Sequence, residues 1–219
     1  MLEFIIGRAC TGKTYQTIER LCRDSVSGRS ILIVPEQFTF ESERSVVRNK
    51  EAVFENISVL SFTRLFDSVV EYIGQGSAFV VSDFEKTVLM KKALNQCSEQ
   101  LTVLSDFIKY KDFPVNISNT IRDIKFSDIT SCKLIDAAES IGGICAAKLK
   151  DIAIIMDTYE ALLSDKFIDP ADKLTRLYEM LCECDYFKNT SVYFDSFSGF
   201  TGQQYKIISK IIEHANKVT

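Results

Sequence analysis

The chain has 219 residues, of which 46% are hydrophobic and 26% are charged, and its formal net charge at pH 7 is −4. This composition excludes a disordered chain, and the length allows one large domain or two smaller ones. The charge gives no global reason to expect a nucleic-acid or membrane partner, and no apolar run has the length of a bilayer span.

The amino terminus carries the pattern of a phosphate-binding loop. Residues 2–6 form a short apolar run that predicts a strand, and residues 15–22 have the spacing of a helix. A chance match in a glycine-containing loop is the competing interpretation, which these flanking elements disfavour. The loop fits Gly-x-x-x-x-Gly-Lys-Thr and reads Gly7-Arg8-Ala9-Cys10-Thr11-Gly12-Lys13-Thr14.

Each residue type in this loop suits an anion. Gly7 and Gly12 permit backbone conformations in which successive N–H groups converge on phosphate oxygens. Lys13 supplies a positive charge for the outer phosphates, and Thr14 offers its hydroxyl to Mg²⁺. The helix that follows points its positive end at the same ligand. The loop therefore predicts binding of nucleotide phosphates, together with Mg²⁺.

Strand and helix patterns alternate after the loop. The β-branched run at 30–34 ends at Pro35, which predicts a strand buried on both faces of a parallel sheet. A helix is expected to end near residue 50, and a third strand is expected at 56–62. The next helix should end at the glycine-rich residues 74–77, the best internal boundary. This order predicts an α/β fold with a parallel sheet.

The middle of the chain differs, because helical patterns follow one another without strands between them. A capping residue at Ser82 opens the first of these helices. Further helices are expected at residues 101–110, 115–126, 131–139, 144–163 and 170–184. We therefore expect residues 1–78 to form the first part of an α/β core and residues 79–187 to form an all-helical insertion. Residues 188–219 are expected to return to the core.

Short basic clusters lie in this helical region. Acidic residues flank each of them, so we interpret them as solvated helix faces and not as a nucleic-acid surface. The apolar stripes of the same helices are interpreted as helix-packing surfaces. The basic clusters are Lys91-Lys92, Lys109 with Lys111, and Arg122 with Lys125.

The sheet pattern returns at residues 191–195, an apolar run that ends in Asp195. A carboxylate at a strand end beside the phosphate loop can hold Mg²⁺ directly or through water. The competing interpretation is a simple capping acid, and the phosphate loop favours the metal-binding role. Thr201 is expected to cap the last helix. Residues 217–219 look like the start of another strand, so we expect the sequence to be a fragment.

The cysteines and the single histidine point to structural roles. The seven cysteines are odd in number and scattered, which indicates reduced thiols in a cytoplasmic protein. Only Cys182 and Cys184 are closely spaced, so a zinc site is not expected and most cysteines are interpreted as buried small side chains. His214 is interpreted as a structural residue at a helix end. The amino terminus lacks the features of a signal peptide.

Several of these stretches together resemble the amino-terminal helicase-like region of AddB-type subunits, the B subunits of bacterial ATP-dependent helicase–nucleases. The resemblance runs in order through nearly the whole chain. It rests on residues 4–8 with 12–14, 33–39, 59–65, and 193–197 with Phe200, Thr201 and Gln203.

The resemblance implies a P-loop NTPase fold, like helicase domain 1A, with a 1B-like helical insertion. Residues 7–14 would be the first ATP motif and Asp195 the second, and candidate contacts in the DNA and nucleotide clefts are Gln37, Arg64 and Gln203. It also implies an A-type helicase–nuclease subunit as partner in a heterodimer, DNA as substrate, and a role in recombinational repair. The nuclease and iron–sulfur residues of such subunits would lie outside this chain.

The sequence departs from active motor helicases at Ser196, where these enzymes have a glutamate after the second-motif aspartate. Loss of a general base typically costs about 10²–10⁴-fold in rate. We therefore expect the chain to bind ATP with weak or no hydrolysis. One alternative is a small-molecule or nucleotide kinase, which the scarcity of arginines after Arg64 disfavours. Another is a scaffold domain for a partner helicase and DNA, without hydrolysis.

Overall fold

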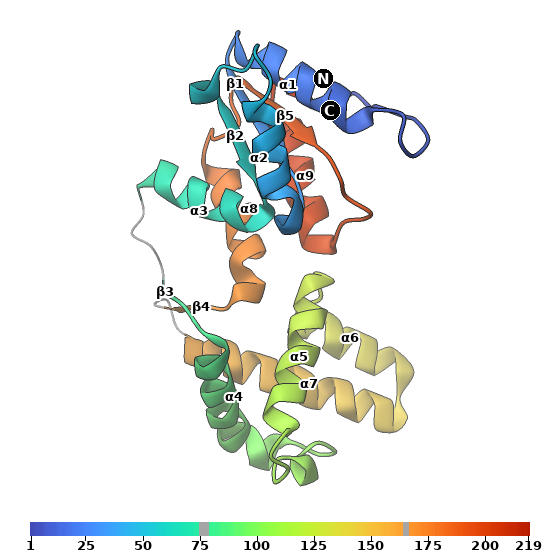
Figure 1. Cartoon of the computed structure of the whole chain (residues 1–219). Helices are drawn as coiled ribbons and strands as arrows, with labels where there is room; N and C mark the ends of the chain where they lie inside the picture. Colours follow the sequence, from blue (N-terminus) through green and yellow to red (C-terminus); the bar gives the residue numbers. More distant parts are fainter. Residues whose placement is uncertain (75–78, 164–166) are drawn as a thin grey trace. The chain divides into compact units, whose positions relative to one another are not determined.

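The computed structural model describes residues 1–74, 79–163 and 167–219. The chain forms two compact units, unit 1 with residues 1–76 and 174–219, and unit 2 with residues 77–173. Figure 1 shows the chain coloured along its length. Of the boundary expected at 74–77, only Gly74 belongs to the described residues.

Unit 1 is built on a parallel sheet in the order β2-β1-β5-β6. Its β-branched, apolar strands suit burial on both faces, as parallel sheets require. The strands expected at 30–34, 56–62 and 191–195 are confirmed, and so is an α/β fold with a parallel sheet. The four strands are β1 (Arg29–Ile33), β2 (Ile57–Leu60), β5 (Thr190–Phe194) and β6 (Lys217–Val218).

Helices cover both faces of this sheet. On one face, Leu21 and Cys22 of α1 pack with Leu32, Val46 and Tyr193 in one buried cluster. Neighbouring strand residues point to opposite faces, so Phe194 faces the other side of the sheet. Its ring centroid lies 6.4 Å from that of Phe62, the first residue of α3. The helices of unit 1 are α1 (Lys13–Ser25), α2 (Thr39–Val47), α3 (Phe62–Ile73), α8 (Lys173–Glu183) and α9 (Gly202–His214).

Helix α8 belongs mostly to unit 1. The sequence analysis assigns the same residues to the helical insertion at 79–187. Two contacts tie α8 to α9. The Gln203 amide donates to the Thr175 hydroxyl at 3.0 Å, and the Lys206 ammonium lies 5.8 Å from the centre of the Tyr178 ring. The helical pattern alone did not reveal which unit α8 packs on, because that depends on residues distant in the sequence.

The strand expected at residues 2–6 does not form. Leu2 makes only an isolated parallel bridge to Val218, with the Glu3 N–H donating to the Val218 carbonyl at 2.8 Å. Phe4 and Ile6 belong to no strand and pair with none of the described strands. Those two side chains are 76% and 92% exposed, which is the opposite of the buried strand that the apolar pattern predicts.

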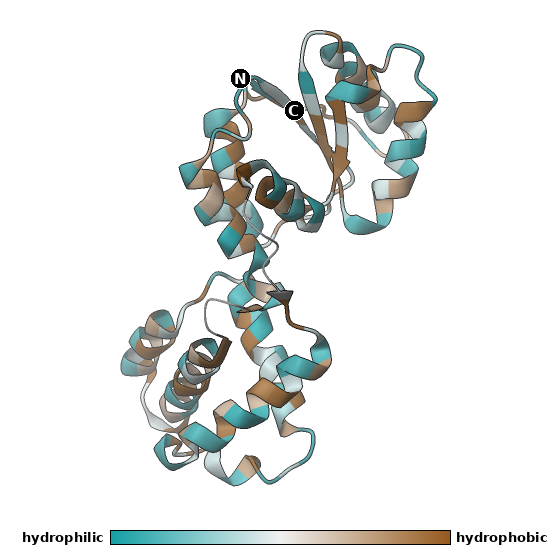
Figure 2. Cartoon of the chain, turned by 90° about the vertical axis from the view of Figure 1, so that its left-hand side faces the viewer, coloured by the Kyte–Doolittle hydropathy of each residue, from teal (hydrophilic) through white to brown (hydrophobic). Residues whose placement is uncertain are grey.

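Unit 2 is helical, with one short two-stranded parallel sheet of β3 (Phe79–Val80) and β4 (Phe167–Ile168) that the sequence did not predict. The apolar stripes pack into one core that includes Met90, Ile121 and Tyr159. Figure 2 shows hydrophobic residues concentrated along the sheet strands and on one side of many helices. The helices of unit 2 are α4 (Asp83–Cys97), α5 (Phe113–Phe126), α6 (Ser131–Ile141) and α7 (Gly143–Leu163).

The helix expected at residues 101–110 is wrong, because only the 3₁₀ turn Ser105–Phe107 forms there. The buried carboxylate of Asp151 accepts hydrogen bonds from the backbone N–H groups of Thr102, Val103 and Leu104 at 2.7 to 3.0 Å. The side chain of Asp151, on α7 (Gly143–Leu163), thus binds the backbone N–H groups that begin this segment and stabilises it as a turn. Sequence periodicity contains no signal for such a tertiary contact.

One basic residue interpreted as solvated is in fact buried. The Lys125 ammonium lies 2.9 Å from an oxygen of Asp172 and 3.1 Å from Glu160 Oε1, and the Lys125 side chain is 4% exposed. Burial would lower the pKa of Lys125, but these two carboxylates outweigh it and raise the pKa above its usual value. Lys125 therefore serves as a charged, paired core residue of unit 2.

All seven cysteines are free thiols, as expected. The interpretation that most are buried is wrong, because only Cys22 and Cys97 are buried and Cys184 is half-buried. The other four lie on exposed helix faces or, for Cys10, on the loop before α1. In the described part of the chain, no helix is both long enough and apolar enough to cross a membrane.

Candidate functional site

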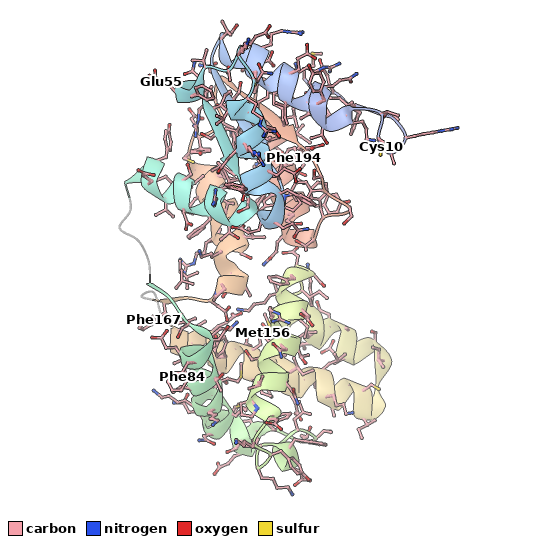
Figure 3. All side chains as sticks on the ribbon, viewed as in Figure 1. Cys10, Glu55, Phe84, Met156, Phe167 and Phe194 are labelled. Atoms are coloured by element: carbon pink, nitrogen blue, oxygen red, sulfur yellow. The ribbon has the colours of Figure 1, made fainter. Side chains whose placement is uncertain are left out.

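The phosphate-loop segment has the backbone geometry that its glycines permit. Gly12 has a φ angle of 81°, in the left-handed region that favours glycine. A Cβ atom at Gly7 would lie 2.5 Å from the hydroxyl oxygen of Thr11, too close for any other residue without movement. Cys10 also has a positive φ, 61°, which is unfavourable for a side chain of its size. Figure 3 shows Cys10 on this loop, before the start of α1.

Lys13 closes the loop on itself. Its ammonium group donates to the carbonyl oxygens of Gly7 at 3.1 Å and Arg8 at 2.7 Å. These two bonds hold a half-buried positive charge at the first turn of α1. Two of the three N–H donors of the ammonium are thus engaged by the loop, which leaves one for an anion.

Helix α1 begins at this charge without a side-chain cap. Its N-cap is Gly12, and no described side chain bonds to its first N–H groups. The first turn contains no acidic residue. The unpaired N–H groups and the positive end of the helix dipole therefore add to the Lys13 charge in favour of an anion.

Asp195 follows β5 directly at the carboxyl edge of the sheet. Its N–H donates to the Ile33 carbonyl of the neighbouring strand at 3.2 Å, which fixes the backbone beneath the carboxylate. Ser196 then has a φ of 65°, and its hydroxyl donates to Asp195 Oδ2 at 3.1 Å. A non-glycine residue in this conformation costs about 1–3 kcal/mol. The chain therefore turns sharply after Asp195, away from the strand direction.

Asp24 of α1 holds this helix against the neighbouring strands β5 and β6. The Tyr193 hydroxyl donates to Asp24 Oδ2 at 2.6 Å, and the Lys217 ammonium lies 3.2 Å from the same oxygen. Burial and this carboxylate both raise the pKa of Tyr193, so it stays a neutral donor at physiological pH. The strand before Asp195 and the helix that carries Lys13 are therefore tied together by the partly buried hydrogen bond from Tyr193 to Asp24.

One cavity brings the sequence-predicted residues together. Lys13, Thr14 and Asp195 all line a cavity of about 580 Å³ in unit 1. This volume falls within the range of roughly 300–1,000 Å³ that small-molecule sites occupy. The described residues before Lys13 in the loop, from Gly7 to Gly12, are not among its lining residues. Much of the remaining wall is apolar, from the amino-terminal segment, α9 and the residues after β5.

Two side chains of this cavity are the predicted metal ligands. Among the described residues, no group of three or more His, Cys, Asp or Glu side chains could hold a metal ion. Mg²⁺ bound to a nucleotide takes most of its ligands from phosphates and water, with one or two protein oxygens. The Thr14 hydroxyl and the Asp195 carboxylate fit that smaller requirement.

A second cavity of about 340 Å³ lies at the carboxyl ends of β1, β2 and β5. Gln37 lines it, together with Pro35 from the same segment and Thr63 from the start of α3. Open parallel sheets bind ligands at this edge. Ser196 and Phe197 line both cavities, so the two sites share one wall.

The other two residues expected in a cleft lie elsewhere. Arg64 forms an ion pair with Glu43 at 2.9 Å and does not line either cavity. Gln203 is 3% exposed and its amide donates to Thr175, so its side chain is part of the packing between α8 and α9. Gln204, the next residue, lines the second cavity.

The aromatic residues around Asp195 were not predicted to take part in the site. Phe197 and Phe200 have ring centroids 4.7 Å apart, and both pack against Phe62 of α3. Phe194, labelled in Figure 3, joins the same group. The sequence feature that could have predicted this aromatic group is the close spacing of Phe194, Phe197 and Phe200. These rings form a rigid apolar wall beside the carboxylate.

Comparison with known proteins finds relatives that match the whole length of the chain. Residues 4–219 match the family described as "ADDB, N-terminal". A protein of Thermoanaerobacter sp. (strain X514), named as the B subunit of an ATP-dependent helicase/deoxyribonuclease, is 35% identical over 224 residues, which cover 100% of this chain and 19% of that protein. The protein of the same name from Clostridium novyi (strain NT) is 33% identical over 221 residues, covering 99% and 20%.

The chain thus spans about a fifth of the length of these relatives. The family match includes the phosphate loop, the sheet edge and Asp195, and it continues through the helical unit 2. On this match the chain belongs to the ADDB amino-terminal family, the amino-terminal region of helicase/deoxyribonuclease B subunits.

Proposed function

We propose that unit 1 is a P-loop NTPase domain that binds MgATP, and that the chain is the helicase-like part of a subunit that processes DNA double-strand ends. The observation that carries the proposal is the single cavity lined by Lys13, Thr14 and Asp195. It supplies a cation, a hydroxyl and a carboxylate, the groups that a nucleotide triphosphate with Mg²⁺ requires. The uncapped start of α1 adds N–H donors on the same side.

Hydrolysis by this chain is expected to be weak or absent. Ser196 stands where a carboxylate would activate water, and its hydroxyl is bonded to Asp195 Oδ2. A serine hydroxyl in that arrangement does not act as a general base near neutral pH. ATP would then serve as a bound ligand that stabilises the folded unit, more than as a fuel.

The proposal for the complete protein rests on its relatives. They are named as B subunits of an ATP-dependent helicase/deoxyribonuclease. We infer from that name a partner subunit and DNA as the substrate. The resemblance noted in the sequence leads us to propose an A-type subunit as the partner and a cytoplasmic role in recombinational repair. The kinase alternative is not favoured, because the family match covers the whole chain.

Magnesium dependence tests the assignment of Asp195. A fluorescent ATP analogue titrated into the wild-type chain is expected to bind more tightly with Mg²⁺ than without it. Asp195→Asn removes the charge that holds the metal, so the gain from Mg²⁺ should fall about tenfold while metal-free binding stays the same. Asp185→Asn, an exposed site in unit 1, is the matched control and should behave as wild type.

Two results would contradict this assignment. If Asp195→Asn keeps the full gain from Mg²⁺, the carboxylate does not hold the metal and acts only as a strand-end cap. If the wild-type chain binds no analogue under either condition, the chain is not a nucleotide-binding domain by itself and the scaffold interpretation is favoured.

A further inference from the structure

Two basic segments that are distant in sequence meet on unit 2. Lys91 on α4 and both Lys109 and Lys111, which precede α5, line one hollow of about 180 Å³. All three side chains are exposed, and none forms a salt bridge with a described residue. Asp106 and Asp112 flank Lys109 and Lys111 in sequence, but among the described residues that line the hollow none is acidic. The flanking acids in the sequence therefore form no salt bridge with these lysines among the described residues.

Exposed aromatic rings lie beside these lysines. Tyr110 lines the same hollow and is 57% exposed, and Lys109 Nζ lies 5.6 Å from the centre of its ring. Phe107 is 44% exposed, with its ring centroid 6.2 Å from that of Tyr110. Both rings are thus accessible from solvent beside the lysines.

Helix α4 extends the same surface. Phe84, Val88 and Lys91 recur at a spacing of three to four residues, which places them on one face of the helix. Phe84 is 78% exposed and Val88 is 50% exposed, and Figure 3 shows Phe84 on α4. Asn95, one turn after Lys91, lines the hollow. Phe84 and Val88 are not among the residues that line the hollow, so the strip that the structure brings together consists of Lys91, Asn95, Lys109, Tyr110 and Lys111.

The size and chemistry of this strip select its ligand. A hollow of about 180 Å³ is smaller than the roughly 300–1,000 Å³ of small-molecule sites. Lysines interleaved with exposed rings are the combination by which proteins bind single strands, because the ammonium groups meet phosphates while the rings stack on unpaired bases. We infer that this strip, defined by Lys91, Asn95, Lys109, Tyr110 and Lys111, is a binding surface for single-stranded DNA.

The inference extends the proposed function by giving unit 2 a DNA contact of its own. It does not depend on nucleotide binding in unit 1, so the test is carried out without ATP. A failure at the phosphate loop and a failure at this strip are therefore observed in separate experiments.

The test measures fluorescence anisotropy of a labelled oligothymidylate of roughly 20 nucleotides, longer than a typical single-strand site. At low salt, Lys109→Ala/Lys111→Ala in the full 219-residue chain is expected to weaken binding about fivefold to tenfold and to make it less salt-dependent. Tyr110→Ala should weaken it about tenfold through lost stacking. The matched control is Lys148→Ala/Lys150→Ala, an exposed pair on α7 with the same spacing and charge change, which should stay within twofold of wild type.

Equal weakening by both lysine pairs would overturn the inference, because it would show that total charge and not this strip binds the strand. An unchanged affinity in Lys109→Ala/Lys111→Ala would overturn it as well. A duplex of the same length distinguishes stacking from charge, since Tyr110→Ala should affect the single strand alone. Thermal unfolding by circular dichroism checks that each variant keeps its fold, which the exposure of these side chains favours.

Discussion

Replacing Lys13 with alanine is expected to weaken binding of a fluorescent ATP analogue by about 100-fold, the largest effect of a single side chain at the site. The ammonium group is held at the first turn of α1 by two carbonyl oxygens, and it is the only cation among the described residues that line the cavity. Its loss leaves the phosphates with N–H donors alone. Equilibrium titration with Mg²⁺ present measures the effect.

The control for this variant is Lys50→Ala, which removes the same charge from an exposed site after α2. It is expected to bind the analogue like wild type, because surface charges separated by more than about 10 Å are screened at ordinary ionic strength. An unchanged affinity in Lys13→Ala would show that the cavity is not the nucleotide site. The loop would then be a relic on a domain that acts as a scaffold.

Replacing Asp151 with alanine is expected to lower the free energy of unfolding by about 3–5 kcal/mol. The carboxylate is 1% exposed and accepts four hydrogen bonds from residues 102–104. Removing it leaves backbone N–H groups without a partner inside unit 2. Denaturant unfolding followed by circular dichroism measures the loss, and Asp157→Ala, an exposed site on the same helix, should change stability by less than about 0.5 kcal/mol.

The contribution of Asp151 also has a defined pH dependence. Burial would raise the pKa of Asp151, but the hydrogen bonds from Thr102, Leu104 and Val103 outweigh it and lower the pKa below its usual value. A carboxyl whose folded pKa is depressed stabilises the protein fully above its unfolded pKa, near 3.9, and loses this contribution as the pH falls through the folded pKa. The stability difference between wild type and Asp151→Asn should therefore shrink below about pH 4. A difference that grows on acidification would contradict this role.

Local features of the sequence predicted much of unit 1. The β-branched runs became β1, β2 and β5, and the Thr201 hydroxyl caps α9 through a bond to the Gln204 N–H, as expected. These features act within a few residues, through side-chain branching, capping hydroxyls and glycine conformations. Lys13, Thr14 and Asp195, which the sequence analysis brings together, line one cavity, whereas residues 7–12 of the loop do not; their role in nucleotide binding stays a prediction.

Features that depend on distant residues could not be predicted in this way. The segment 101–110 has helical spacing, but the Asp151 carboxylate on α7 binds its backbone. Gln203 looks like a polar cleft residue, yet it is buried against α8. Residues 2–6 look like a strand, yet only an isolated bridge from Leu2 to Val218 forms there.

The sequence by itself determined which reactive groups this protein carries, namely the Gly-x-x-x-x-Gly-Lys-Thr pattern of residues 7–14, the carboxylate of Asp195 and no acid at position 196. These are properties of adjacent residues, and any fold that keeps them keeps their chemistry. Only the tertiary structure decided which charges are neutralised. It buried Lys125 between two carboxylates, and it brought Lys91 together with Lys109 and Lys111 on one exposed surface. The reason is physical, because the effect of a charge depends on distances in space and on burial, which sequence separation does not specify.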